Sequence, residues 1–361
     1  MSGLKDHYEE LEALESCADR VRTAGLPVYI YGMGSGGEKM LGWCRDNGIA
    51  VTGVFASDDF VRGQSFCGYK VKSLAQAEKE SGELTVLLGF GTDLPDVMSR
   101  IESIEKRHLL LAPDVSVAGD RAFDKQTFLD DLHRAAKAYD LLADEQSRRV
   151  FLKLSEYKIS GRLSYLREIF SNDKDSLVKT GDNEVYCDLG AYNGDTVRSF
   201  IKAAGGRYEH IYALEPEKRN FQKCVKSCLS FDRISFINAA AWSCDTQLSF
   251  EGGSGRQARL DESGSGKTAA RSLDSVLAGS GCTYIKYDVE GADIPALEGS
   301  KKTIKGFTPK LRCAVYHRCY DYIDIPLYIN SLGCGYRFYM RQDRYYPAWE
   351  TEIIAVSGED T

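Results

Sequence analysis

A short apolar strand that ends in an acidic residue and continues into a glycine turn constrains this chain more than any other feature. The run is VYCDLGAYNGDT, from Val185 to Thr196. Gly190 permits a tight turn and lets a ligand approach the backbone closely. The helix expected after the turn leaves backbone amide donors free for an anionic group such as a carboxylate. This order of elements predicts an open α/β sheet with a ligand site at the carboxyl edge of its strands.

A second acidic residue indicates a nucleoside-bearing ligand. The next predicted strand ends in Glu215-Pro216, and an acid at that place typically accepts hydrogen bonds from ribose hydroxyls. The turn reads D-x-G-x-x-x-G-x-T, and Asp188 before its first glycine attracts a cationic amino group and repels a pyrophosphate. S-Adenosylmethionine carries an ammonium and a sulfonium, whereas NAD carries phosphates, so the charge favours the methyl donor. In the alternative interpretation, Asp188 and Glu215 are ordinary strand-end acids that cap loops.

Strand and helix patterns alternate in two stretches, residues 1–120 and 181–361, which predicts two mainly parallel sheets with helices on both faces. Residues 121–180 carry helical patterns without strand signals and are expected to link the two units. The Gly- and Ser-rich stretch 251–267 is predicted to form a hairpin or loop. The expected fold class is α/β, with a smaller N-terminal Rossmann-like domain, a helical linker and a seven-stranded C-terminal domain. The C-terminal strands are expected at 185–189, 211–214, 234–239, 284–288, 311–316, 336–341 and 351–356.

Composition disfavours several classes of protein. The chain carries 46 basic and 53 acidic residues, a formal net charge of −7, and an acidic chain is a poor binder of nucleic acid. Its longest apolar runs fall far short of the roughly 18 residues that cross a bilayer, and charges occupy the N-terminus where a signal peptide needs an apolar stretch. The 11 cysteines are scattered, which predicts free thiols in a reducing cytoplasm.

A further run, KYDVEGAD from Lys286 to Asp293, crowds four charges at the end of another predicted strand. A strand covered on both faces carries such charges only where they point into a crevice. Together with the two strand ends described above, this run resembles the FkbM family of S-adenosylmethionine-dependent methyltransferases. RSLD at residues 271–274 and VYHR at residues 315–318 belong to the same likeness, which covers about residues 180–356.

The resemblance implies a class I methyltransferase fold with S-adenosylmethionine as donor and S-adenosylhomocysteine as product. Glu215, followed by Pro216, would hold the ribose, and Asp288 would lie beside the donated methyl group. Members of the family mostly methylate hydroxyl groups, often on sugars or natural-product scaffolds. The methionine part would lie in the turn that contains Asp188, Gly190, Ala191, Tyr192, Asn193 and Thr196, and the adenine would border Ala240 and Ala241.

An alcohol is a weak nucleophile near neutral pH, so a base or a cation assists its methylation. His317, which ends a predicted strand, is the best candidate base, and a structural histidine is the alternative. Asp288 could act as the base or orient the acceptor hydroxyl. Lys286 shares a strand face with Asp288, because alternate residues of a strand point the same way, so an ion pair is as plausible as a catalytic role.

Four side chains near this strand end offer oxygen or imidazole ligands that suit Mg²⁺: Asp288, Glu290, Asp293 and His317. The acids are also explained as caps of the next helix, whose N-terminus favours negative charge. The sequence therefore leaves Mg²⁺ as an alternative and assigns no metal ligands.

The N-terminal stretch carries a separate glycine pattern. Gly32, Gly34 and Gly37 follow a predicted strand and open a helix, and Asp58 ends the next strand. That context suits a dinucleotide fingerprint. Because no hydride-transfer residues follow, the unit is either a nucleotide or nucleotide-sugar site, or a structural or dimerising module.

Three classes of function follow from these patterns. The first is O-methylation of a hydroxyl on a glycan or small natural-product-like metabolite. The second is an NAD(P)- or nucleotide-sugar-binding oxidoreductase or epimerase, and the third is a non-catalytic Rossmann scaffold. In the first case, aromatic residues of the C-terminal stretch are plausible walls of the acceptor site: Tyr316, Tyr320, Tyr322, Tyr339, Tyr345, Tyr346 and Trp349.

Overall fold

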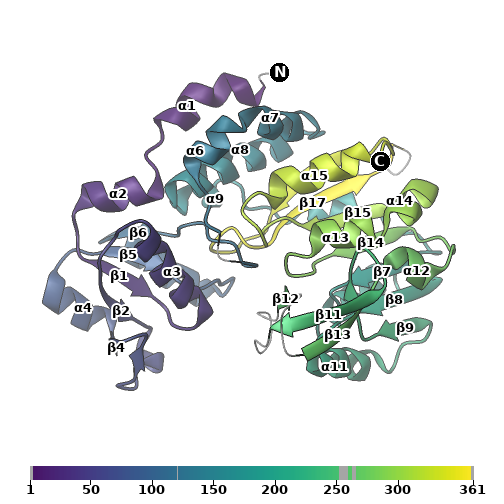
Figure 1. Cartoon of the computed structure of the whole chain (residues 1–361), viewed down its shortest axis with the longest axis horizontal. Coiled ribbons are helices and arrows are strands. Elements are labelled where there is room, and N and C mark those ends of the chain that lie inside the picture. Colours follow the sequence, from purple (N-terminus) through teal and green to yellow (C-terminus); the bar gives the residue numbers. More distant parts are fainter. Residues whose placement is uncertain (1–2, 120, 252–258, 262–265, 359–361) are drawn as a thin grey trace.

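Two α/β units lie side by side in the computed structural model, with a group of helices packed above them (Figure 1). The structure describes residues 3–119, 121–251, 259–261 and 266–358. Most of the predicted loop at 251–267 therefore lies outside the described residues. Among the described residues, no helix combines the length and the apolar character needed to cross a bilayer.

The N-terminal unit is a six-stranded sheet in the order β3-β4-β2-β1-β5-β6. Its strands are parallel except for the β3–β4 hairpin. The sequence predicts four strands in this unit, at 28–31, 51–55, 84–89 and 108–111. All four are present, and the short hairpin was not predicted. The strands are β1 (Val28–Tyr31), β2 (Val51–Phe55), β3 (Ser65–Phe66), β4 (Tyr69–Lys72), β5 (Thr85–Leu88) and β6 (Leu109–Leu111), with α3 (Ser35–Asp46), α4 (Leu74–Ser81), α5 (Pro95–Glu105) and the 3₁₀ helix η2 (Asp58–Phe60).

The helix pattern before this sheet is broken. Apolar residues at helical spacing predict one helix over residues 4–24. The structure instead has η1 (Leu4–His7), α1 (Tyr8–Ala13) and α2 (Cys17–Ala24). Ser16 has extended backbone angles and its hydroxyl accepts a hydrogen bond from Asp19 N, so it starts a new helix as an N-cap. Apolar spacing alone carried no sign of this break.

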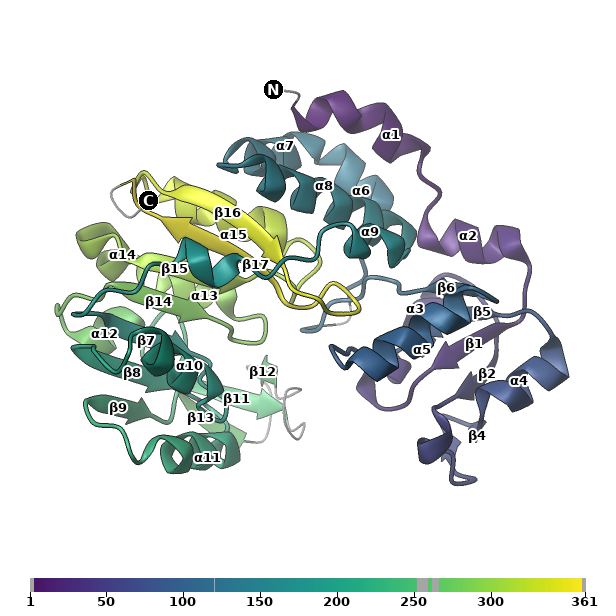
Figure 2. The same cartoon turned by 180° about the vertical axis from the view of Figure 1, so that it is seen from behind.

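Helices fill the stretch between the two sheets, as predicted. They are α6 (Lys125–Asp130), α7 (Leu132–Asp140), α8 (Glu145–Ser160), α9 (Ser164–Arg167) and the 3₁₀ helix η3 (Lys174–Leu177). The longest of them, α8, packs on the edge strand of the C-terminal sheet (Figure 2). Arg341 on that strand is almost fully buried and pairs with Asp144 at the start of α8 (2.7 Å) and with Asp173 (3.0 Å).

The C-terminal unit is a seven-stranded sheet in the order β16-β17-β15-β14-β7-β8-β9. Strand β17 runs in the opposite direction to the other six. The order reverses direction between β7 and β14, which is where open α/β sheets bind their ligands. All seven predicted strands are present within two residues at each end. They are β7 (Val185–Leu189), β8 (His210–Leu214), β9 (Ile234–Ile237), β14 (Tyr284–Tyr287), β15 (Lys310–Ala314), β16 (Arg337–Gln342) and β17 (Thr351–Val356).

Further elements surround this sheet. A second, four-stranded sheet that was not predicted follows β9. The sequence predicts one helix over about residues 292–304, and the structure splits it in two at Gly299–Ser300. The small sheet comprises β10 (Ala240–Ala241), β11 (Thr246–Glu251), β12 (Arg259–Asp261) and β13 (Gly266–Arg271). The helices are α10 (Asp195–Ala203), α11 (Lys218–Cys228), α12 (Leu273–Leu277), α13 (Asp293–Glu298), α14 (Lys301–Phe307) and α15 (Asp321–Ser331).

The N-terminal unit meets the C-terminal sheet at its carboxyl edge. Thr92, just after β5, forms an antiparallel bridge with Tyr346 in the loop between β16 and β17. A Cβ atom on Gly91 would lie 2.3 Å from the ring of Trp349 in the same loop. This loop ends next to the carboxyl end of β15, because β17, which follows it, pairs antiparallel with β15. The contact therefore places the N-terminal unit beside the expected ligand edge.

Candidate active site

The glycine turn after β7 is wedged between two neighbouring strand ends. Gly190 N and Ala191 N both donate to Leu214 O at the end of β8 (3.0 and 2.9 Å). Gly190 has a φ of +92°, and a Cβ atom there would lie 1.9 Å from Asp288 O. Glycine is required by both the backbone conformation and the space. The turn therefore brings the ends of β7, β8 and β14 together.

Asp188 and Lys286 form a buried pair at this edge. They face each other in the register of β7 and β14, and Lys286 Nζ lies 3.3 Å from Asp188 Oδ1 and 3.4 Å from Asp288 Oδ2. Burial alone would lower the pKa of Lys286, but the two carboxylates raise it above its usual value. The Thr196 hydroxyl donates to the other oxygen of Asp188. In this structure the cation that faces Asp188 is therefore a lysine of the chain itself.

Glu215, at the end of β8, is a buried carboxylate with remaining acceptor capacity. Its two oxygens accept backbone hydrogen bonds from Tyr192 N (2.9 Å) and Glu217 N (2.8 Å). Burial raises the pKa of Glu215 to about 7, against the lowering effect of these bonds. Each carboxylate oxygen has two lone pairs, so each can accept one further hydrogen bond. A carboxylate with this free acceptor capacity fits the two hydroxyls of a ribose.

His317 is fully buried between carboxylates. Its Nδ1 is hydrogen-bonded to Asp293 Oδ2 (3.0 Å), and its Nε2 lies 3.2 Å from Asp288 Oδ1 and 3.8 Å from Glu290 Oε2. Burial opposes charge on the ring, but Asp293 and Asp288 outweigh it and raise the pKa of His317 well above its usual value. The ring is therefore an imidazolium at neutral pH. A protonated ring has no free nitrogen lone pair, so this state favours an electrostatic role over that of a base.

Asp288 is the partly exposed carboxylate that contacts both Lys286 and His317. Its side chain is 33% exposed, whereas those of Asp188 and His317 are 0% exposed. Burial of its surroundings would raise the pKa of Asp288, but Lys286 and His317 hold it well below its usual range. The Tyr316 hydroxyl lies 3.4 Å from Asp288 Oδ1. Asp288 is thus an ionised carboxylate, held by a lysine and a histidine, that can contact a ligand.

Comparison with known proteins identifies this part of the chain. Residues 188–338 match the family model described as the methyltransferase FkbM domain. The chain carries a methyltransferase FkbM domain. The matched range includes Asp188, Glu215, Asp288 and His317, so the predicted resemblance is confirmed over the strand ends that form the site.

A solved structure shares the fold over nearly the whole chain. It is the methyltransferase FkbM from Methylobacillus flagellatus, with a TM-score of 0.73, 17% sequence identity and coverage of 97% of each chain. This likeness extends the shared fold to the N-terminal unit and the helical segment. No curated protein matches the sequence.

Other solved structures match about half of the chain. An rRNA methylase from Streptococcus thermophilus has a TM-score of 0.35 at 12% identity, and covers 54% of this chain and 96% of its own. A fibrillarin from Aeropyrum pernix, in complex with natively bound S-adenosyl-L-methionine, has a TM-score of 0.33 at 13% identity, and covers 50% of this chain and 69% of its own.

The remaining predicted residues of the FkbM domain lie around the same edge. Asn193 O accepts hydrogen bonds from Arg198 (3.2 Å) and Ser227 (2.7 Å) within the glycine turn. The Asn238 amide donates to Glu215 O (2.8 Å) and Pro216 O (3.1 Å), which places the chain after β9 beside Glu215. The predicted adenine border follows directly as strand β10, where Ala240 and Ala241 are both buried.

The predicted Mg²⁺ alternative is not supported by the geometry. Asp288 and Glu290 lie on the Nε2 side of His317, whereas Asp293 lies on its Nδ1 side. These four groups therefore do not converge on one cation. His317 Nδ1 and oxygens of Asp293 and Asp321 do lie within 4.8 Å of one another, but the hydrogen bond between His317 and Asp293 explains this proximity. Burial and Asp293 raise the pKa of Asp321 to about 7.

Part of the predicted aromatic wall is core. Tyr322 and Tyr346 are fully buried and Tyr339 is 7% exposed, so these three pack inside the protein. Tyr316 remains next to Asp288, and Tyr345 stacks with Trp349 at a centroid distance of 6.1 Å. Those three residues stay as predicted walls of the acceptor site. Tyr320 instead stacks with Phe123 at a centroid distance of 5.2 Å, and its hydroxyl donates to Asp124 O (3.2 Å).

The glycines of the N-terminal unit form a tight turn between β1 and α3. A Cβ atom on Gly37 would lie 2.9 Å from Gly32 O, and one on Gly36 would lie 2.1 Å from Gly89 O. Gly34 has a φ of +88°. The glycines therefore serve close packing of α3 on the sheet, while Asp58 lies exposed in η2. Nucleotide binding by this turn stays a prediction.

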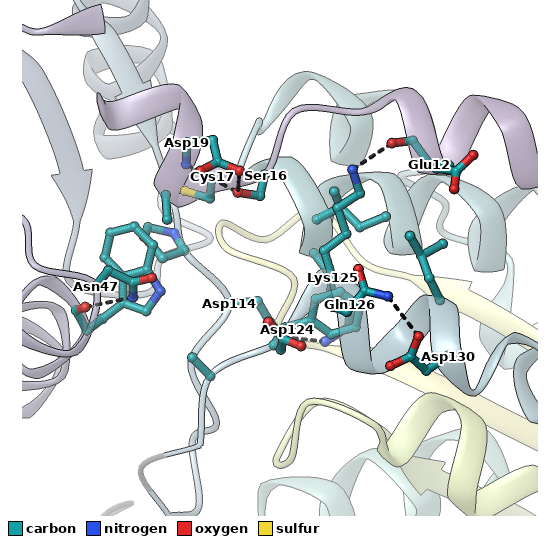
Figure 3. Close-up of a pocket in the computed structure, with 18 of the residues that line it drawn as sticks. Glu12, Ser16, Cys17, Asp19, Asn47, Asp114, Asp124, Lys125, Gln126 and Asp130 are labelled. Carbon is teal, nitrogen blue, oxygen red and sulfur yellow. Dashed lines mark hydrogen bonds and ion pairs between the residues drawn. The ribbon is translucent and has the colours of Figure 1, made fainter. Parts of the chain in front are cut away.

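A separate cavity of about 490 Å³ lies between the N-terminal unit and the helical segment (Figure 3). It contains none of the residues assigned to the FkbM site. Trp43 of α3 and Asn47, which follows that helix, line one side, and Lys125 and Gln126 of α6 line another. Lys158 pairs with Asp114 at its wall (2.7 Å).

Proposed function

We propose that the FkbM domain binds S-adenosylmethionine and transfers its methyl group to a hydroxyl of a glycan or a small natural-product-like metabolite. The observation that carries the proposal is the ionised, partly exposed Asp288 at the point where the strand order reverses, on the same sheet edge as the Glu215 carboxylate. The match to a methyltransferase FkbM domain supports the class of reaction.

The residues present fit the donor. The bound cofactor supplies a methyl group on a sulfonium, which is activated for in-line displacement. Glu215 has unused lone pairs for ribose hydroxyls. Asp288 adds negative charge near the sulfonium, which is favourable by Coulomb attraction. Asp188 acts through Lys286 and Thr196, which it holds in place.

For the acceptor, Asp288 orients the hydroxyl and receives its proton. The C–S bond would break with its electron pair on sulfur while the C–O bond forms, and the hydroxyl becomes strongly acidic as positive charge develops on its oxygen. A weak base such as Asp288 therefore suffices, because the proton passes to it in the same transition state. Lys286 and His317 keep Asp288 ionised and fixed in orientation, which reduces the reorganisation needed in the transition state.

The test uses the full chain with methyl-tritiated S-adenosylmethionine and a panel of sugars, nucleotide sugars, phenols and polyols. Calorimetry with S-adenosylmethionine, S-adenosylhomocysteine and NAD(P)H accompanies it. Donor binding and label transfer to a hydroxyl acceptor are the expected results. Binding of NAD(P)H without the methyl donor would favour the oxidoreductase or epimerase, and donor binding without transfer to any acceptor would favour the scaffold.

We expect donor affinity to depend on Glu215 and on pH. Ribose hydroxyls donate to the ionised carboxylate, and the pKa of Glu215 is about 7, so ionisation between pH 6 and pH 8 strengthens binding. The ratio of the Kd of Glu215→Gln to the Kd of wild-type protein should therefore rise about tenfold over this range. The donor's own amino group titrates equally with both proteins and cancels in this ratio. A constant ratio would contradict the assignment of Glu215 to the ribose.

The pH dependence of turnover distinguishes two roles of His317. Because the pKa of His317 is raised well above its usual value, a base role for His317 would make the turnover number rise with pH between pH 6 and pH 8. We expect instead a turnover number constant to about twofold over this range, since the imidazolium holds Asp288. Stopped assays at saturating donor measure it, and a steep rise with pH would assign His317 as the base.

A further inference from the structure

A hairpin from the N-terminal half of the chain packs against the backbone of His317. We call its described residues, 114–119 and 121–123, the docking hairpin. Val115 pairs with Ala122 in an antiparallel bridge. Ser116 N donates to Arg121 O (2.9 Å). The hairpin is therefore a defined element with its own backbone hydrogen bonds.

The segment that carries His317 depends on this hairpin for support. β15 ends at Ala314, and beyond it the backbone no longer pairs as a named strand. Ala118 N donates to His317 O (2.9 Å), and Cys319 N donates to Ser116 Oγ (3.3 Å). The hairpin thus bonds to the backbone at His317 itself and two residues beyond it. These bonds fix the position from which the imidazole reaches Asp288.

The hairpin also contacts the loop that follows Asp288. A Cβ atom on Gly291 would lie 2.3 Å from Ala118 Cβ, so the two segments approach as closely as a glycine allows. Arg318 Nε donates to Gly291 O (2.9 Å). Ala118 therefore touches both segments whose side chains form the His317–Asp288 contact.

One lysine of the N-terminal sheet organises the tip of the hairpin. Lys39 lies on α3, and its Nζ donates to Ser116 O, Val117 O (2.6 Å) and Gly119 O (3.0 Å). An ammonium has three N–H donors, and here three hairpin carbonyls converge on it. Without that cation, the three carbonyl dipoles would point at one another.

We propose that Lys39 is a positioning residue of the methyl-transfer site: it shapes the docking hairpin, which fixes His317 against Asp288. The N-terminal unit then completes the active site of the FkbM domain. This inference rests on the proposed role of His317 and goes beyond it by assigning a residue outside the family match, which begins at residue 188.

The test variant is Lys39→Met, which keeps the length of the side chain and removes its charge. In hydrogen–deuterium exchange of the full chain, amides of residues 115–119 and 316–320 should exchange at least tenfold faster than in wild type. In protein labelled with ¹³C-histidine, the ring signal of His317 should shift or broaden. The signals of His108 and His210 should stay unchanged.

Controls separate positioning from general damage. Lys70→Met removes an exposed lysine of the same unit and should change neither readout. Ser116→Ala removes only the hydroxyl that binds Cys319 N, and should accelerate exchange around Cys319 while the protein stays folded. S-Adenosylhomocysteine should bind Lys39→Met within twofold of wild type, because the Glu215 side of the site is untouched.

Two results would overturn the proposal. One is exchange within twofold of wild type and an unchanged His317 signal in Lys39→Met. The other is a change that also alters His108 and His210, since that means general loss of fold. Neither readout needs the methyl acceptor. If wild-type protein fails to bind the donor, the proposed function fails, whereas these measurements still decide whether Lys39 positions His317.

Discussion

Asparagine in place of Asp288 should lower the turnover number for methyl transfer by about 10²- to 10⁴-fold. The substitution keeps the shape of the side chain and removes the group that orients the acceptor hydroxyl and receives its proton. Lys286 keeps its second partner, Asp188, at 3.3 Å, so the fold is expected to persist. The Kd of S-adenosylmethionine, measured by calorimetry, should change little because Glu215 is intact.

Glu290→Gln is the matched control for this prediction. Glu290 lies next to the same histidine, with Oε2 3.8 Å from His317 Nε2 and a side chain 37% exposed. Its substitution removes one negative charge from the same loop without touching the Lys286–Asp288 pair. We expect a far smaller loss of turnover than for Asp288→Asn. Equal losses would mean that local charge, rather than Asp288 itself, drives the reaction. If Asp288→Asn keeps a tenth or more of wild-type turnover, Asp288 has no part in the mechanism.

The ligand edge of the FkbM domain could be predicted because its signals are local. A glycine that must turn tightly and acids at the ends of buried strands are visible within ten residues of sequence. Parallel strands then bring those ends to one edge, so Asp188, Glu215 and Asp288 meet there as expected. The strand alternation likewise gave all seven strands, since fully buried strands leave long apolar runs.

Pairing partners could not be predicted in the same way. Charge suggested that Asp188 faces the ammonium of the donor, whereas the structure pairs it with Lys286 across β7 and β14. The sequence placed Lys286 on the same strand as Asp288, but the register between β7 and β14 is set by packing over about a hundred intervening residues. The charged state of His317 follows from the same kind of contact, with Asp293 and Asp288.

The docking hairpin left no signal in the sequence. Residues 114–123 carry no motif, and their contact with His317 joins positions about two hundred residues apart. The helix break at Ser16 and the small sheet β10–β13 were missed for a related reason, because short elements are decided by capping and by neighbours rather than by periodicity. Such features require the assembled structure.

Methionine in place of Lys286 should destabilise the FkbM domain by about 3–5 kcal/mol. Lys286 is the cation between Asp188, which is fully buried, and Asp288. Its removal leaves a buried carboxylate without its counter-ion, and that cost exceeds any gain from the apolar side chain. Native-state hydrogen exchange of amides in β7 and β14 measures the opening free energy of this part of the chain directly.

The double variant Asp188→Asn with Lys286→Met tests the cause. Removing both charges removes the unpaired carboxylate, so more than half of the lost free energy should return, as expected when a buried ion pair is replaced as a unit. Lys305→Met, at an exposed position of α14, is the control and should change the opening free energy little. If the double variant is no more stable than Lys286→Met, the lysine contributes by packing rather than by charge, and the electrostatic account of this edge is wrong.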